Sequence, residues 1–172
     1  MKMKANKILS KLIILIILAT NIGCDQVSKS IVRQKIDYNE KISVIDGFVT
    51  LIKVENTGAF LGLGNQLPRV RYIILMIILP LIVIGYVLYY LFKNNTLSKP
   101  LSLGISFAIG GGIGNIIDRI LYSSVTDFLH FEFLLFQTGI VNIADISITI
   151  GFFILIYELL INRSELKLKT AK

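Results

Sequence analysis

Two asparagine–aspartate pairs with the same spacing are the residues of this 172-residue chain best suited to chemistry. Asn115 precedes Asp118 by three positions and Asn142 precedes Asp145 by three, so on a helix each amide lies about one turn from its carboxylate. Two carboxylates brought together where water is scarce cannot both be ionised cheaply, so one stays protonated while the other acts as a base. Such a pair can activate water for attack on a peptide carbonyl and protonate the leaving amine.

Other kinds of catalytic centre find little support in the sequence. The chain has one cysteine, Cys24, and one histidine, His130. These counts exclude a disulfide framework, a cysteine-based zinc cluster and a multi-histidine metal site. A metal bound only by carboxylates and asparagines would have a ligand set poor in nitrogen and sulfur. We therefore expect carboxylate chemistry with no metal and no cofactor.

The composition indicates where such a site would have to lie. Hydrophobic residues make up 54% of the chain, charged residues 17%, and the mean hydropathy is +0.73. A water-soluble domain carries about a quarter charged residues, so the composition predicts an integral membrane protein. The net charge is +7, but the basic residues flank apolar runs and do not gather with aromatic residues on one soluble face. This distribution favours lipid headgroups over nucleic acid as the partner.

Four apolar segments predict a single membrane domain built as a bundle of four transmembrane α-helices, since a span needs about 20 apolar residues. In the first outer loop, residues 25–69, two β-branched segments are joined by Asp46–Gly47, a strong turn signal. A glycine-punctuated stretch follows them, which we expect to act as a mobile flap. Pro80, inside the second span, predicts a kink. The spans lie at about residues 8–24, 70–92, 100–118 and 140–161, with a second outer loop at 119–139.

The basic residues near the ends of the spans predict the orientation of the chain. Ten of the 18 lysines and arginines lie at the two chain ends and in the short connection between the second and third spans. Such residues favour the cytoplasmic side, so we expect both termini in the cytoplasm and both long loops outside. The ten residues are Lys2, Lys4, Lys7, Lys11, Lys93, Lys99, Arg163, Lys167, Lys169 and Lys172.

With this orientation, the order of the spans brings three acids to a similar depth near the outer leaflet. The first span ends at Asp25, the third ends at Asp118, and Asp145 lies about five residues into the fourth. Gly110 and Gly114 precede Asp118 at intervals of four, so Asp118 continues a stripe of small residues that lets another helix approach closely. Ionisable groups within spans are costly and face the bundle interior, which makes function the default hypothesis.

Several of these acids also have plain structural interpretations. Asp118 and the arginine that follows it are compatible with a helix-end ion pair that faces lipid headgroups. Asp145 is compatible with an acid favoured by the positive end of a helix. Asp25 forms a good structural pair with Lys29 at i+4, and for Asp25 we favour structure or substrate positioning over catalysis. Asp127 is most simply explained as a solvated loop acid.

Five short motifs follow one another along the chain in a fixed order. They are Asp25–Gln26–Val27–Ser28–Lys29, Asn56–Thr57–Gly58–Ala59–Phe60, Gly111–Gly112–Ile113–Gly114–Asn115–Ile116–Ile117–Asp118–Arg119, Val125–Thr126–Asp127–Phe128 and Asn142–Ile143–Ala144–Asp145. Each is weak alone. In this order, on a four-span chain of this length, they resemble the lipoprotein signal peptidases, the bacterial signal peptidase II family, over nearly the whole chain.

The resemblance implies an aspartyl endopeptidase that removes signal peptides from bacterial prolipoproteins, cutting on the N-terminal side of the diacylglyceryl-modified cysteine. It implies a multi-pass protein of the cytoplasmic (inner) membrane, with an extracytoplasmic β-cradle and a short flap. We expect lipid-modified prolipoproteins and membrane lipids as partners, and a monomeric protein. The catalytic pair of the family maps onto Asp118 and Asp145. The residues that bind substrate or orient the site map onto Asp25, Lys29, Asn56, Gly58, Asn115, Arg119 and Asn142.

The chain departs from the pattern of this family at two positions. The family's flap motif usually has one more small residue before its aromatic residue, whereas here Phe60 follows Ala59 directly. The motif of the fourth span usually begins with an aromatic residue, which Val141 replaces here. Neither change affects an acid, so the catalytic assignment is not altered, but the packing of the flap is expected to differ.

Two other functions remain open at this point. A non-enzymatic channel or proton-coupled carrier would use the acids as a relay and predicts polar residues across the whole bilayer. The second span has none between Tyr72 and Tyr86, and the fourth is apolar from Ile150 to Ile156, which favours a one-sided site. A lipoprotein cleaved between Gly23 and Cys24 predicts a shortened chain that carries lipid on the cysteine.

Overall fold

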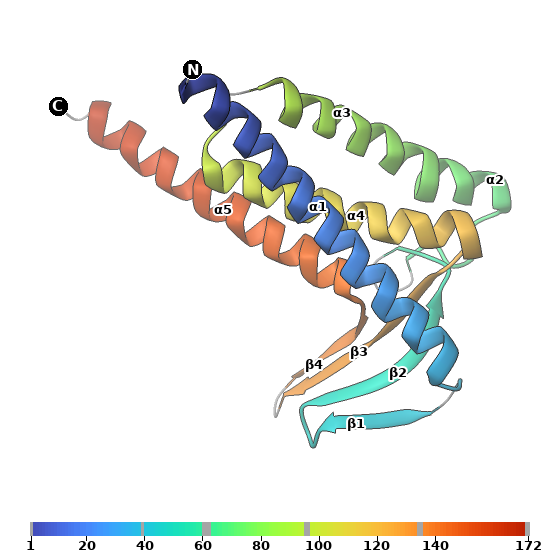
Figure 1. Ribbon diagram of the computed structural model, residues 1–172. Coiled ribbons are helices and arrows are strands. Elements are labelled where there is room, and N and C mark those ends of the chain that lie inside the picture. The colour runs from blue at the N-terminus through green and yellow to red at the C-terminus, as the bar shows by residue number, and fades with distance from the viewer. Residues whose placement is uncertain (1, 39, 60–62, 95–96, 134–135, 171–172) are drawn as a thin grey trace.

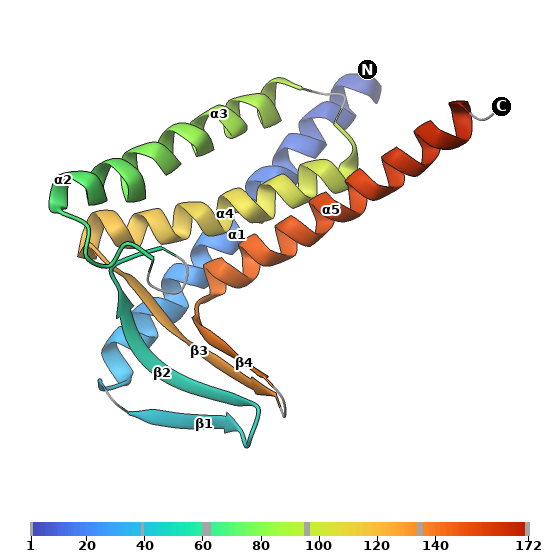
Figure 2. The ribbon, with the colours of Figure 1, turned by 180° about the vertical axis from the view of Figure 1, so that it is seen from behind.

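The computed structural model describes residues 2–38, 40–59, 63–94, 97–133 and 136–170 (Figure 1). The helices form a bundle, and a small antiparallel sheet lies at one end of it. The helix that begins the chain and the helix that ends it both have their outer ends at the opposite end of the bundle (Figures 1 and 2). The predicted fold class, four membrane helices with a small β-rich unit, is confirmed.

The helices are longer than the apolar segments that predict them. Four parts of them are long and apolar enough to cross a membrane: Ile8–Lys35, Arg69–Lys93, Lys99–Tyr122 and Ile143–Ile161. The first helix in particular continues without interruption through Asp25 and Lys29, so both of these residues are helical. The complete helices are α1 (Lys2–Lys35), α2 (Arg69–Tyr72), α3 (Leu79–Lys93), α4 (Lys99–Tyr122) and α5 (Ile143–Thr170).

The second membrane helix changes its winding next to its internal proline. A π-helical segment, Ile73–Ile78, joins α2 to α3, and Pro80 lies in the first turn of α3. Proline has no N–H to donate to the carbonyl four residues earlier, that of Met76, and its ring crowds that carbonyl. A wider turn relieves the crowding. Where the sequence predicts a kink, the structure has a π-helical segment that ends two residues before the proline.

The sheet joins the two long loops that lie between the helices. Its strands β1 (Lys41–Ile45), β2 (Val49–Asn56), β3 (Val125–Phe133) and β4 (Phe136–Val141) pair in sequence order, all antiparallel. The predicted turn connects β1 to β2, and Gly47 has a φ of 74°, which favours glycine. Between β2 and β3, Val54 lies opposite Asp127 and Asn56 opposite Val125. The pairing of two distant loops therefore brings Asn56 and Asp127 close together.

Helix α4 is the centre of the bundle and packs against α1, α3 and α5 (Figure 2). Its glycines make this possible. A Cβ on Gly110 would lie 2.8 Å from the Cβ of Asn21 in α1, and one on Gly114 would lie 2.5 Å from Oδ2 of Asp25. A Cβ on Gly111 would overlap the carbonyl oxygen of Ala144 in α5. The predicted close approach of a second helix along this stripe is confirmed, and α4 makes a further close approach to α5.

We predict that Gly111→Ala destabilises the protein by about 1–3 kcal/mol, because the new methyl group forces α4 and α5 apart. The matched control is Gly85→Ala in α3, where a Cβ meets nothing within 4 Å. Thermal unfolding in detergent micelles measures both variants. Equal unfolding temperatures for the two variants would contradict the close packing of α4 on α5.

Candidate active site

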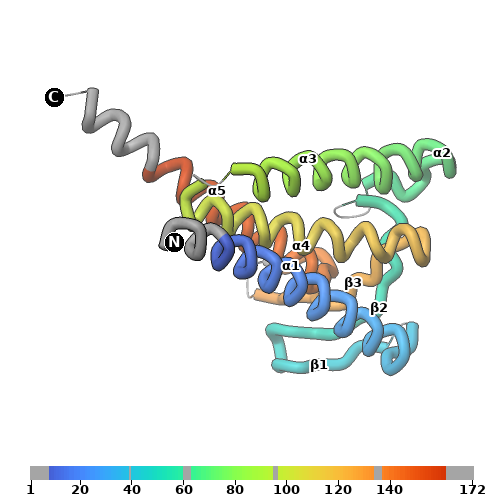
Figure 3. The backbone as a smooth tube through the Cα atoms, turned by 45° about the horizontal axis from the view of Figure 1, so that its top comes forward, coloured from blue at the N-terminus to red at the C-terminus, as the bar shows by residue number. Residues whose placement is uncertain are grey.

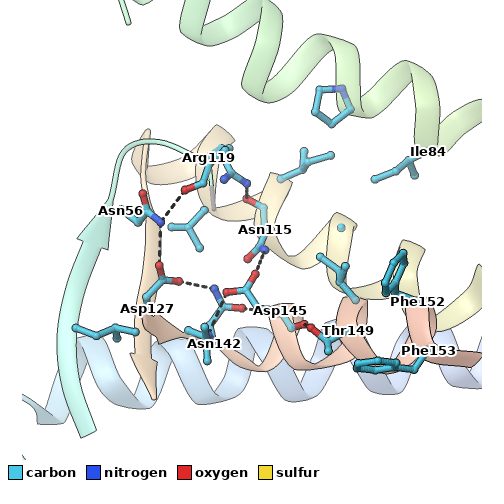
Figure 4. A pocket seen from close by; sticks show the side chains of 18 residues that line it. Asn56, Ile84, Asn115, Arg119, Asp127, Asn142, Asp145, Thr149, Phe152 and Phe153 are labelled. Atoms are coloured by element: carbon cyan, nitrogen blue, oxygen red, sulfur yellow. Dashed lines mark hydrogen bonds between the residues drawn. The ribbon is translucent and has the colours of Figure 1, made fainter. Parts of the chain in front are cut away.

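A cavity of about 630 Å³ lies where α4 and α5 meet the sheet (Figure 4). One part of it is polar, and the other extends along the helices between apolar side chains. The polar part is lined by Asn56, Asn115, Arg119, Asp127, Asn142 and Asp145. The apolar part includes Pro80, Ile84, Ile148, Phe152 and Phe153. Such a cavity suits a ligand that has both a polar group and an apolar chain.

Two acids line this cavity, Asp127 from β3 and Asp145 from the first turn of α5. Asp127 is only 4% exposed. Its Oδ1 accepts a hydrogen bond from Nδ2 of Asn142 at 2.6 Å, and its Oδ2 accepts one from Nδ2 of Asn56 at 3.0 Å. Oδ1 of Asp145 accepts a hydrogen bond from Nδ2 of Asn115 at 2.9 Å. Both carboxylates are thus held by neutral amide donors, as Figure 4 shows.

Asn142 connects the two acids because it stands just before α5. Its Oδ1 accepts a hydrogen bond from the backbone N–H of Asp145 at 2.9 Å, and its own backbone N–H donates to Oδ2 of Asp145 at 3.2 Å. This reciprocal arrangement is a capping box, which explains the spacing of three residues. The amide nitrogen of Asn142 remains free for Asp127. The second Asn-x-x-Asp motif therefore fixes one acid through the backbone and the other through a side chain.

Arg119 and Asn56 hold the beginning of the predicted flap beside the cavity. Nη2 of Arg119 donates to the carbonyl oxygen of Gly58 at 2.9 Å, and Oδ1 of Asn56 accepts the N–H of Gly58 at 3.0 Å. Nδ2 of Asn56 also donates to the carbonyl oxygen of Ala59 at 3.2 Å. Nε of Arg119 is buried and has no hydrogen-bond partner among the described residues. The predicted site residue Gly58 is thus at the site through its backbone, whereas Phe60 lies outside the described residues.

Asp118 does not line the cavity. Its side chain is fully buried, with Oδ2 at 2.7 Å from Nη2 of Arg33 and at 3.3 Å from Nζ of Lys29. The predicted pairing of Asp118 with Asp145 therefore does not match the geometry. Asp118 continues the glycine stripe of α4 and so faces α1, whereas Asn115 lies on the neighbouring face and reaches α5. The same Asn-x-x-Asp spacing has different consequences within a helix and at its beginning.

Asp25 and Lys29 form the structural pair that their spacing predicts, at 2.8 Å and with no exposure of either side chain. Oδ1 of Asp25 also accepts the backbone N–H of Ala144 at 2.9 Å, which links α1 to the first turn of α5. Nζ of Lys29 donates to Oδ1 of Asn115 at 2.9 Å. Because an ammonium can only donate, it binds the amide oxygen and leaves the NH₂ of Asn115 directed at Asp145.

Asp127 is the site residue whose environment the sequence analysis predicts wrongly. It is not a solvated loop acid, because residues 125–128 at the start of β3 are all buried. The available signal was the motif Val125–Thr126–Asp127–Phe128, in which two apolar residues flank a polar pair and which is one of the five motifs of the resemblance. Recognising that signal requires knowing that β2 covers this segment, which no local pattern in the sequence indicates.

Burial of Asp127 away from water raises the pKa of its carboxyl group from 3.8 to about 6. The hydrogen bonds from Asn56 and Asn142 lower this pKa, while the nearby charge of Asp145 raises it further. One acid of the pair therefore keeps a proton up to a higher pH, about 6, than an ordinary aspartate does. Within the described part of the chain, no group of three or more His, Cys, Asp or Glu side chains is arranged to hold a metal ion.

Comparison with known proteins assigns this architecture to a family. Residues 13–161 match the model of the family described as signal peptidase (SPase) II. The chain belongs to the signal peptidase II family. A lipoprotein signal peptidase of Maridesulfovibrio salexigens is 36% identical over 148 residues, which cover 86% of this chain and 95% of that protein. One of Bacillus pumilus is 33% identical over 146 residues, which cover 85% of this chain and 91% of that protein.

A solved structure of a bacterial membrane enzyme agrees with this assignment. It superposes with a TM-score of 0.77 at 28% identity, covering 88% of this chain and 90% of that one. The resemblance to the signal peptidase II family that the five motifs indicate is thus confirmed. The chain is a multi-pass membrane peptidase. The channel or carrier that the sequence leaves open is not supported by this family.

We predict that the stability difference between wild type and Asp127→Asn depends on pH. The folded-state pKa of about 6 lies above the unfolded value of 3.8, so between these values the folded wild type binds a proton that its unfolded form does not. Relative to the variant, wild type should gain about 2 kcal/mol as the pH falls from 7.5 to 4.5. Unfolding in detergent micelles across this range measures the difference. A constant difference would contradict the raised pKa.

Proposed function

We propose that this protein is an aspartyl endopeptidase that removes the signal peptide from diacylglyceryl-modified prolipoproteins, with Asp127 and Asp145 as its catalytic pair. The observation that carries the proposal is that these two acids line one cavity and are joined through Asn142. The apolar extension of the same cavity supports a lipid-bearing substrate. Membership of the signal peptidase II family supports the substrate class, since the two relatives described above are lipoprotein signal peptidases.

In this mechanism one water molecule lies between the two carboxyl groups and the scissile carbonyl. Asp145, held by hydrogen bonds from Asn115 and from the backbone of Asn142, takes a proton from the water as it attacks. Asp127, whose pKa is raised by burial, holds the proton that polarises the carbonyl oxygen. The acquired proton then passes to the leaving amine, which completes cleavage on the N-terminal side of the lipidated cysteine.

The other polar residues of the cavity position the reactants. Asn115 and Asn142 orient the two carboxylates, as their hydrogen bonds indicate. Arg119 lines the cavity, and its buried Nε, which has no partner among the described residues, is suited to bind a substrate backbone carbonyl. Asn56 ties Asp127 to the start of the flap, so closure of the flap over the substrate is coupled to the position of this acid.

The substrate enters laterally from the bilayer, with its acyl chains along the apolar part of the cavity. Ile84 of α3 and Phe152 and Phe153 of α5 line that part, and both phenylalanines are more than half exposed on the outer surface of the bundle. This arrangement lets the acyl chains remain in lipid while the peptide reaches the acids. Movement of the lipid out of the bilayer is not required.

We infer that both termini are cytoplasmic and that the site lies near the outer leaflet. The ten basic residues that flank the spans support this orientation by the positive-inside rule. The position of the sheet and its cavity at the end of the bundle away from the two termini agrees with it (Figure 1).

We predict that Asp127→Asn and Asp145→Asn each lower kcat for a lipidated precursor by roughly 10²–10⁴-fold, because each removes one proton-transferring group. The matched control is Asp37→Asn, the same change at an exposed position between α1 and β1, which should cleave at the wild-type rate. Cleavage is followed in detergent micelles, and unfolding temperatures identify the variants that are folded. Wild-type cleavage by a folded Asp127→Asn protein would rule out the proposed pair.

Asp118→Asn distinguishes the pair proposed here from the pair that the sequence predicts. Its main effect should be a lower unfolding temperature, because Lys29 and Arg33 lose a buried counter-charge. The kcat per folded molecule should be retained. A variant that unfolds at the wild-type temperature but loses as much kcat as Asp145→Asn would return Asp118 to the catalytic pair.

A further inference from the structure

A second cavity, of about 360 Å³, lies between α1, α3 and α4 at the end of the bundle away from the sheet. We call it the terminal groove. Figure 3 shows the three helices α1, α3 and α4. Residues 10–17 of α1, the end of α3 and the beginning of α4 contribute to the lining of the groove. Its walls are mostly apolar, with Ile13, Ile14, Ile17, Leu91, Leu97 and Leu103. Ile13 is 48% exposed and Leu103 37%, so these walls reach the outer surface of the bundle.

The polar residues of the terminal groove include two lysines and no acid. Lys11 comes from α1 and Lys99 is the first residue of α4, and none of the described residues that line the groove is Asp or Glu. Within the described part of the chain, no ion pair involves either lysine. Lys29, by contrast, lies within ion-pair distance of two carboxylates. The groove thus presents two positive charges that the described residues do not neutralise.

The depth of the groove in the membrane limits what can occupy it. The membrane-crossing parts of α1 and α4 begin at Ile8 and Lys99, so both lysines lie near one membrane surface while the apolar walls continue into the bilayer. A phosphate at the level of the lysines and an acyl chain along the walls match these two regions. Basic pockets between membrane helices bind anionic headgroups in this way, and lysine stems extend along apolar surfaces to reach them.

We propose that the terminal groove binds one anionic phospholipid of the adjoining leaflet. Lys11 and Lys99 contact its phosphate, and the apolar walls hold one acyl chain. The absence of an acid among the described lining residues disfavours zwitterionic lipids, whose ammonium group would meet two further cations. The bound lipid contacts α1, α3 and α4 together. It lies at the end of the bundle where apolar residues of α1 and α3 belong to one cluster. The site is separate from the cavity of Asp127 and Asp145 and does not depend on the proposed peptidase mechanism.

The test measures lipid retention by native mass spectrometry of the full chain. The protein is released from micelles that contain equal amounts of phosphatidylglycerol and phosphatidylcholine with the same acyl chains. Wild type should retain one phosphatidylglycerol in preference to phosphatidylcholine. In the double variant Lys11→Gln/Lys99→Gln, the ratio of retained phosphatidylglycerol to retained phosphatidylcholine should fall by at least roughly five-fold. The matched control, Lys35→Gln/Lys41→Gln, removes two exposed charges at the other end of the molecule and should retain it.

Two further measurements separate the parts of the proposal. Leu103→Trp fills the groove without changing its charge and should also lower phosphatidylglycerol retention, and it remains informative if the double variant is unfolded in phosphatidylcholine micelles. Glycerol phosphate, which has the phosphate without acyl chains, should not displace the lipid. Equal loss in both double variants, unchanged retention in Leu103→Trp, or displacement by glycerol phosphate would each overturn the proposal.

Discussion

The ammonium of Lys29 is the interaction on which the arrangement of this protein depends. It lies in a fully buried position within reach of Asp25, Asp118 and Asn115, so one cation joins two carboxylates and an amide of two helices. Removing one partner from a buried ion pair leaves an uncompensated charge, which is far more costly than the pair itself. Arg33 adds a second cation at Asp118, and the four charges balance. This cluster fixes the position of α1 against α4 at the depth of the cavity.

Counter-charge distinguishes the structural acids of this molecule from those suited to catalysis. Asp25 and Asp118 each form an ion pair with a cation, Asp25 with Lys29 and Asp118 with Arg33. Among the described residues, the hydrogen bonds to Asp127 and Asp145 come from neutral amides, which suits these two acids to the proposed mechanism. Asn115 connects the two groups, because it accepts from Lys29 and donates to Asp145. The ion cluster therefore orients the proposed catalytic site through Asn115.

Local patterns were sufficient to predict the helices, the β1–β2 hairpin with its Asp46–Gly47 turn, and the close approach along Gly110 and Gly114. They were not sufficient to choose between Asp118 and Asp127. That choice depends first on which face of α4 meets α1. It depends also on the pairing of β2 with β3, which lies some 70 residues further along the chain, as the hydrogen bond between Asn56 and Asp127 shows. Span order places acids at a common depth, but only packing decides which of them meet cations.

The capping box of α5 also bears on how the protein becomes active during its synthesis. Asp145 serves both as part of the first turn of the last membrane helix and as one of the two cavity acids. A nascent chain that has already inserted its first three spans contains Asp127 but lacks the partner acid and the asparagine that orients both. Under the proposed mechanism, a chain can therefore cleave its substrate only after its last helix has inserted.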